Sequence, residues 1–361
     1  MLHIKKLRGN LSHCFNINKS RMDCLCLIIL SMVKVRTVNL SELAQGLDSG
    51  KKLKTKQRRL QRFFEKSDID VNKFAIFIIK ILGLVNARFY LAMDRTNWKY
   101  GEKNINILLV SIVCSNYAIP LYWTMLNKRG NSNYKERNKL FENILKIIDA
   151  DCIAGILADR EFIGPKWFKF LYDNNLPLYI RLRKDLKINV YNTELRVDKL
   201  FSSLKKAGDI KNINNASLCS YPISLQATIN EDEELMVIAS NTDGTNNLAI
   251  YKKRWEIETM FGFFKTKGFN FESTHITDME KIKKMVVVIG IAYVWSVKAG
   301  EWLEKIEPIK IKKHGRKEIS IFRYGLDFIR EILLSSDRKI KRKILMIVNF
   351  LALKDKESWS Y

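Results

Sequence analysis

The chain contains few of the residues that build zinc sites. Its 361 residues include six cysteines and four histidines, and no two cysteines have the Cys-x-x-Cys spacing. We therefore expect no zinc domain, and the lack of a paired cysteine pattern favours a reducing cytoplasm.

Long apolar runs are also missing. The longest, Met285–Val297, is shorter than the roughly 20 residues that span a bilayer, so we interpret it as a buried helix. The basic N-terminus is not followed directly by an apolar segment with a small-residue cleavage site, so no signal peptide is expected. No internal repeat or low-complexity segment is evident.

Acidic residues are scarce. The 38 Asp and Glu are outnumbered by 63 Lys and Arg, which gives a formal net charge of +25. Three runs concentrate the basic residues: Lys51–Arg59, Lys310–Lys317 and Arg338–Lys343. Such a charge indicates a polyanionic partner, and without a spanning segment we favour nucleic acid over a membrane.

One segment combines charge with aromatic residues in an unusual way. Tyr251, Arg254, Glu258 and Lys265 are separated by three, four and seven residues. In one α-helix they would fall within an arc of roughly 60°, which places a carboxylate between two cations and a phenol. Charged helix faces are ordinarily solvated, but the surrounding Trp and Phe residues favour a helix in a core that turns this face towards a cleft.

Two aspartates end apolar runs elsewhere in the chain. Asp94 follows Phe89–Met93, and Asp159 follows the run that begins at Cys152. Each run predicts a buried strand with an acid at its C-terminal end, which is where open α/β sheets bind ligands. Either aspartate alone is better explained as a turn or helix-capping residue, but the two together with Glu258 indicate a site.

Asp, Asp and Glu in this order, with a Y-x2-R-x3-E-x6-K pattern around the Glu, resemble the DDE transposases of bacterial insertion sequences. The resemblance covers about residues 85–275. It implies that Asp94, Asp159 and Glu258 are catalytic and bind two Mg²⁺ ions, which Mn²⁺ could replace. It also implies that Tyr251, Arg254 and Lys265 bind a phosphate at the DNA end.

The resemblance implies cut-and-paste transposition, in which the ends of an element are cut and their 3′-hydroxyls joined to target DNA. The expected partners are double-stranded DNA, as terminal inverted repeats and target, and a second copy in a dimeric synaptic complex on the bacterial nucleoid. Two alternatives stay open: a nuclease of the same fold without strand transfer, and a catalytically idle, transposase-derived DNA-binding protein.

The order of predicted elements gives the fold class. Three strand-like segments, a helix, a strand, a helix and a strand follow one another from residue 89, the β-β-β-α-β-α-β order of a ribonuclease H-like α/β core. We therefore predict a helical DNA-binding region at 1–85, a catalytic core at 86–185 and 241–275, a β-rich insertion at 186–240, and a helical region at 276–361.

The N-terminal region has a basic helix of its own. Residues from Asn39 to Phe64 predict a short capped helix, a glycine-containing turn and a basic helix, an order similar to helix-turn-helix proteins. An ordinary helical hairpin with a solvated basic face explains the pattern equally well. If DNA is bound here, we expect mainly phosphate contacts. The candidate residues are Lys51, Lys52, Lys54, Lys56, Arg58, Arg59 and Arg62.

Related transposases stack an extruded base on a tryptophan of the insertion when they form a DNA hairpin. This insertion has no tryptophan. Tyr191, Phe201 or Tyr221 could stack a base, although packing within their own sheet is the better expectation. Groups that could orient the acids are Arg95, Trp98, Arg160 and Glu161, and His275 could touch DNA.

Overall fold

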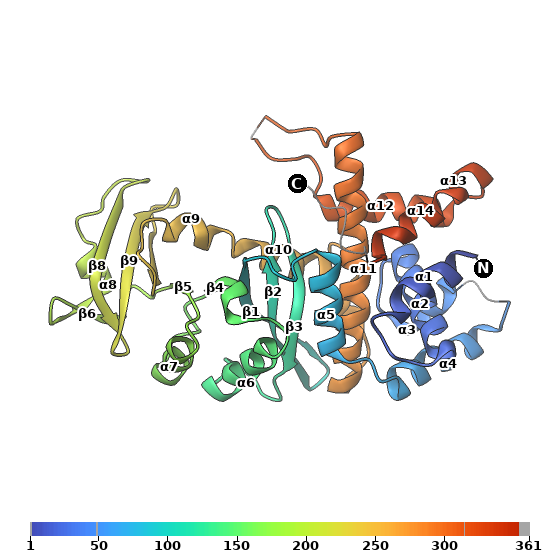
Figure 1. Cartoon of the computed structure of the whole chain (residues 1–361), viewed down its shortest axis with the longest axis horizontal. Helices are drawn as coiled ribbons and strands as arrows, with labels where there is room; N and C mark the ends of the chain where they lie inside the picture. The colour runs from blue at the N-terminus through green and yellow to red at the C-terminus, as the bar shows by residue number, and fades with distance from the viewer. Residues whose placement is uncertain (1, 48–49, 314, 354–361) are drawn as a thin grey trace. The chain divides into compact units, whose positions relative to one another are not determined.

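A computed structural model of the chain describes residues 2–47, 50–313 and 315–353 (Figure 1). The chain divides into two compact units, which we describe separately. The first consists of residues 1–84, 98–105 and 260–361, and the second of residues 85–97 and 106–259. The four predicted domains follow sequence patterns and not compact units, and their boundaries stay a prediction.

The second unit is built on one ten-stranded sheet, whose order is β3-β2-β1-β4-β5-β10-β9-β8-β6-β7. Its first five strands are β1 (Phe89–Tyr100), β2 (Lys103–Val113), β3 (Ala118–Met125), β4 (Ile153–Ala158) and β5 (Leu178–Arg181). Strand β4 runs parallel to both β1 and β5, while β2 and β3 pair antiparallel. This order confirms the predicted ribonuclease H-like α/β class.

Two helices connect the parallel strands, as predicted: α6 (Tyr134–Leu145) and α7 (Pro165–Asp173). Helix α6 begins at a capping box, in which Asn133 accepts from the backbone N–H of Glu136 and the Glu136 side chain accepts from that of Asn133. Proline occupies the first position of α7, where its missing N–H leaves no bond unmade. A short 3-10 helix, Ala150–Cys152, precedes β4.

The β-rich segment after β5 continues the same sheet. Strand β10 (Leu235–Ser240) pairs antiparallel with β5 on one side and with β9 (Tyr221–Ile229) on the other. Beyond β9 lie β8 (Ile210–Leu218), β6 (Lys187–Val190) and β7 (Thr193–Arg196), with the short helix α8 (Val197–Leu200) between β7 and β8 (Figure 1). Helix α9 (Asn247–Lys252) then packs against β5, β9 and β10.

The first unit is helical. Its N-terminal helices are α1 (Leu2–Ser12), α2 (Lys19–Val35), α3 (Leu40–Gly46), α4 (Leu53–Lys66) and α5 (Val71–Ile81). Its C-terminal elements are the 3-10 helix Phe271–Ser273, α11 (Met279–Ile306), α12 (Ile321–Leu334), α13 (Arg338–Arg342), α14 (Ile344–Val348) and the 3-10 helix Asn349–Leu351. Helix α10 (Trp255–Phe264) crosses the boundary between the two units.

Helix α11 is the centre of the first unit and packs against α12, α2, α4 and α5. Two glycines permit the closest approach to α12: a Cβ atom at Gly300 would strike the backbone of Ile321, and one at Gly325 would strike that of Ser296. Among the described residues α11 is the single helix long and apolar enough to cross a membrane, but 83% of its most apolar window is buried inside the protein. It is the buried helix that the Met285–Val297 run predicts.

Candidate active site

The first two predicted catalytic acids follow neighbouring parallel strands. The pairing of β1 with β4 ends where Met93 lies opposite Ala158. Asp94 and Asp159 are the next residues of the two segments, at the same end of the paired strands. One detail of the prediction is wrong, because β1 does not stop at Asp94 but continues to Tyr100. Beyond Asp94 the strand stays in the hairpin with β2, after its partner β4 has ended.

The Asp94 carboxyl is largely buried, with one fifth of its side chain exposed. The backbone N–H of Arg95 donates to its Oδ1 at 2.7 Å. Burial raises the pKa of Asp94 to about 6, against the opposing effects of the Arg254 charge and the Arg95 N–H. The carboxyl group is therefore an anion at neutral pH, and the positive charge of the cation beside it favours this ionised form.

That cation is Arg254, whose side chain is 10% exposed. One guanidinium nitrogen donates to Asp94 Oδ2 at 3.3 Å, and the other donates to Glu258 Oε1 at 2.5 Å. The guanidinium carbon also lies 5.5 Å from the centre of the Tyr251 ring. Arg254 thus links Asp94, the acid carried by β1, to the Glu and Tyr of the predicted signature.

The predicted single helix through the signature is wrong. The backbone forms α9, a turn at Lys253 and Arg254, and then α10. In the turn, the Arg254 N–H bonds the Tyr251 carbonyl and the Ile257 N–H bonds the Arg254 carbonyl, three residues back rather than four. This tighter winding separates α9 from α10 (Figure 1). Arg254 still contacts both Tyr251 and Glu258.

The remaining signature residues differ in their surroundings. Tyr251 is 5% exposed, and burial raises the pKa of its hydroxyl to about 12, so the phenol stays protonated at neutral pH. Lys265 follows the last residue of α10 and belongs to the first unit, where its Nζ pairs with Glu272 at 2.8 Å. It is not part of the Arg254 cluster as the structure describes it.

Arg95, the residue after Asp94, forms the best-connected polar group near the acids. Its Nε and one terminal nitrogen donate to the two oxygens of Glu161 at 2.7 and 2.8 Å. Its other terminal nitrogen donates to the Gly130 carbonyl at 2.8 Å and to Asn106 at 3.2 Å. Because Glu161 lies two residues after Asp159, this bidentate pair ties together the two backbone segments that carry the acids.

The other secondary candidates are simpler. Arg160 is exposed. Trp98 packs on Phe271 at 4.7 Å between ring centres, and His275 stacks on Tyr100 at 5.2 Å. These two are ring contacts within the first unit.

The three aromatic residues proposed for base stacking are not equivalent. Phe201 is 1% exposed, which leaves no ring face for a base. Tyr221 packs against Tyr172 at 4.5 Å between ring centres. Tyr191 is 73% exposed at the turn between β6 and β7 and is the one of the three whose ring is open to solvent.

The predicted metal ligands are oxygen donors of the type that Mg²⁺ prefers, so the chemistry of the donor set fits a hard divalent ion. Within residues 2–47, 50–313 and 315–353, however, no three His, Cys, Asp or Glu side chains are close enough to hold a metal ion together. In this arrangement Asp94 and Glu258 pair with the Arg254 guanidinium. That Asp94, Asp159 and Glu258 would hold the ion stays a prediction.

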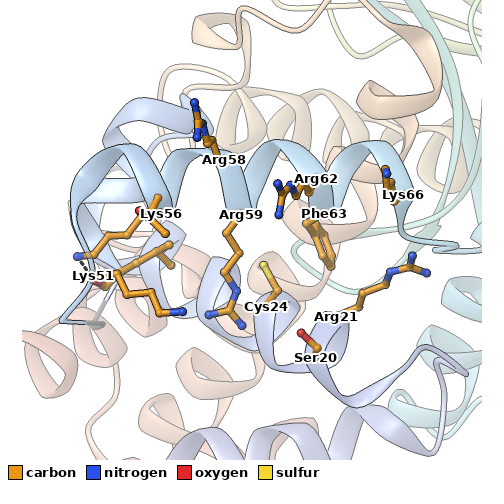
Figure 2. A pocket seen from close by; sticks show the side chains of 12 residues that line it. Ser20, Arg21, Cys24, Lys51, Lys56, Arg58, Arg59, Arg62, Phe63 and Lys66 are labelled. Carbon is orange, nitrogen blue, oxygen red and sulfur yellow. Dashed lines mark hydrogen bonds between the residues drawn. The ribbon is translucent and has the colours of Figure 1, made fainter.

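The basic N-terminal candidates separate into two groups. A cleft of about 650 Å³ lies between α2 and α4, and Lys51, Lys56, Arg58, Arg59 and Arg62 line it (Figure 2). Lys52 and Lys54 do not line it. Arg21 and Lys66 also line the cleft, although neither was predicted to bind DNA. The spacing of Lys66 from Arg59 and Arg62 is visible in the sequence, whereas Arg21 joins them only through the packing of α2.

Comparison with known proteins agrees with the geometry. The family model described as a transposase DDE domain matches residues 87–295. The chain belongs to this transposase family, whose members act on DNA. No curated protein matches the sequence. Among solved structures, the NurA nuclease from Sulfolobus solfataricus is similar over 65% of this chain and 93% of that chain, at 12% identity and a TM-score of 0.26.

Proposed function

We propose that this chain is a cut-and-paste DNA transposase that cleaves the ends of its element and joins the freed 3′-hydroxyls to target DNA. The observation that carries the proposal is the placement of Asp94 and Asp159 directly after the last paired residues of β1 and β4. Arg254 links Glu258 to Asp94. Membership of the transposase family supports the same chemistry.

Two chemical steps are needed. In cleavage a water oxygen forms a bond to phosphorus while the bond from phosphorus to the 3′-oxygen breaks, which leaves a 3′-hydroxyl and a 5′-phosphate. In joining, that 3′-hydroxyl forms the new bond to a target phosphorus, and the target strand's own 3′-oxygen leaves. Divalent ions, when bound, activate the attacking oxygen and stabilise the leaving one. Asp94, Asp159 and Glu258 would hold them.

The cations and the phenol orient the DNA. Arg254 Nε is buried and has no hydrogen-bond partner among the described residues, so it is a donor available to a phosphate oxygen. Release of Asp94 and Glu258 from Arg254 would leave both carboxylates for metal and the guanidinium for DNA. Tyr251 adds a hydroxyl donor to the same phosphate, and Lys265 a point charge. Pairing two element ends requires at least a dimer on DNA.

The test is a cleavage and joining assay on DNA that carries the terminal repeats flanking the element, with Mg²⁺ or Mn²⁺. Wild type should produce metal-dependent cuts at the repeat ends and joined products, and Glu258→Gln should produce neither. Glu256→Gln is a matched control, since Glu256 lies on the same helix and has no part in the cluster. It should keep both activities.

Other results identify the alternatives. Cuts without joined products would favour a nuclease. DNA binding without chemistry in either protein would identify an idle DNA-binding relic, and wild-type cutting by Glu258→Gln would exclude the assigned site.

A further inference from the structure

Cations make up more than half of the residues that line the cleft between α2 and α4. Among the described residues, its lining contains no aspartate or glutamate, and its charged members come from both helices and the loop before α4. They are Arg21, Lys51, Lys56, Arg58, Arg59, Arg62 and Lys66.

These cations are not neutralised by the protein. Among the described residues none of the seven forms an ion pair, and the aspartate in the first turns of α2, Asp23, is held by Arg8 at 2.8 Å. Lys56 donates to the carbonyl of Leu47 at 2.7 Å, a neutral acceptor. Like charges gathered in one cleft repel one another, so the arrangement is favourable chiefly when an anion is bound.

The two helices present their donors to the same space. On α4, Thr55, Arg59, Arg62 and Lys66 follow at intervals of four, three and four, which puts them on one face within an arc of about 60°. Opposite them, Ser20, Arg21 and Cys24 lie in the first turns of α2. Figure 2 shows Arg59 extending from α4 towards Cys24, with Arg21 rising from the facing helix.

The size of this face distinguishes a polymer from a small anion. Eleven residues separate Thr55 from Lys66, so the face is about 16 Å long at 1.5 Å per residue. Successive base pairs of DNA advance by about 3.4 Å, so a face of this length spans several phosphates of one strand. Hydroxyls of Ser20 and Thr55 in the lining are further donors of the kind that contact phosphate oxygens.

We propose that this cleft binds the phosphodiester backbone of duplex DNA, with Arg21 and Lys66 contributing beside the basic residues of α4 and Lys52 and Lys54 taking no part. This assignment rests on the proposed transposase function in one respect, which is that DNA is the partner. The contact is independent of base sequence, so it positions the duplex and does not read it.

The experiment measures DNA affinity of the full chain across a salt series from about 50 to about 200 mM, in EDTA, with two fluorescent duplexes of unrelated sequence. Arg21→Gln and Arg62→Gln should each weaken binding of both duplexes alike and lower the slope of log affinity against log salt by about one. The matched control Lys54→Gln, on the same helix but outside the cleft, should keep the wild-type slope.

Three results would overturn the proposal. One is an equal loss of slope in Lys54→Gln, which would mean diffuse attraction. Another is weakening confined to one duplex, which would mean base contacts. A third is displacement of DNA by inorganic phosphate well beyond the effect of chloride at equal ionic strength, which would mean a small-anion site.

An effect on DNA binding can be distinguished from effects on folding and on catalysis. Arg62 is exposed, so Arg62→Gln should have the wild-type melting temperature, and the measurement stands even if Arg21→Gln is less stable. Because binding is measured without metal, failure of the cleavage assay would leave the cleft assignment intact. An unchanged slope in Arg62→Gln would likewise leave the catalytic assignment intact.

Discussion

The cations of the two regions differ in what neutralises them. At the sheet edge, Arg254 contacts Asp94 and Glu258. Arg95 donates to Glu161, to the Gly130 carbonyl and to the side-chain oxygens of Asn106 and Asn131. In the cleft between α2 and α4, seven cations have no carboxylate among the lining residues that the structure describes. Paired charges hold a site in shape, whereas unpaired charges of one sign bind a partner of the other sign. The contrast fits the two proposals, chemistry at the first region and DNA binding at the second.

The sharpest test of this contrast removes the chemistry alone. Asp94→Asn should abolish cleavage and joining, because it removes a carboxylate ligand, while DNA affinity measured in EDTA stays close to wild type. Gel assays of product and of binding on the same preparation compare the two. Asp151→Asn, an exposed acid shortly before β4, serves as the control and should cut normally.

The Arg95–Glu161 pair tests whether paired charges position the acids. Glu161→Gln should lower metal-dependent cleavage by about 10- to 100-fold and weaken activation by Mn²⁺, as expected for a group that orients metal ligands. It should also cost about 1 to 3 kcal/mol of unfolding free energy, because it leaves the half-buried Arg95 without its anion.

Adding Arg95→Gln to Glu161→Gln should recover part of that stability in urea unfolding. It should not restore metal activation. If stability and activity fall and recover together in the single and double variants, the Arg95–Glu161 pair has only a structural role.

The raised pKa of Asp94 predicts a pH dependence of stability in the metal-free protein. The folded state holds this proton up to about pH 6, whereas the unfolded chain loses it near pH 4, so the unfolded state binds fewer protons between these values. The Asp94 contribution should therefore lower the unfolding free energy as pH rises from about 4 to about 6, by up to about 3 kcal/mol. Urea unfolding of wild type and Asp94→Asn should converge at low pH and diverge in favour of Asn above it.

The smallest effect is expected when a carboxylate is added to the cleft, so that its cations have an acidic partner as those at the sheet edge do. Thr55→Glu places a carboxylate among the cleft cations and in the first turn of α4. It should stabilise the fold by about 0.3 to 1 kcal/mol and weaken DNA binding by about tenfold. Thermal unfolding and the salt series measure the two changes. Thr55→Gln, which matches Thr55→Glu in size but has no charge, removes only the hydroxyl and should weaken DNA binding much less than Thr55→Glu does.

The sequence predicts the parts of the core that depend on local patterns. The apolar runs before Asp94 and Asp159 predict two buried strands, and β1 and β4 are indeed neighbours. The turn at Arg254 was missed because residue spacing reports a helical period and does not reveal a tight bond to the third residue back. Arg21 was missed because it approaches α4 only through tertiary packing, and the guanidinium that separates Asp94 from Glu258 depends on rotamers that no spacing encodes.

The ten-stranded sheet has only two edges, and both discourage pairing with another chain. Strand β3 forms one edge and contains Pro120, which has no N–H to offer an incoming strand. Strand β7 forms the other; it has four residues, all exposed, two of which are Glu194 and Arg196. Short, charged or proline-containing edges are the usual protection against strand-to-strand aggregation. The long sheet therefore does not by itself promote fibres or disordered assemblies when many copies gather on DNA.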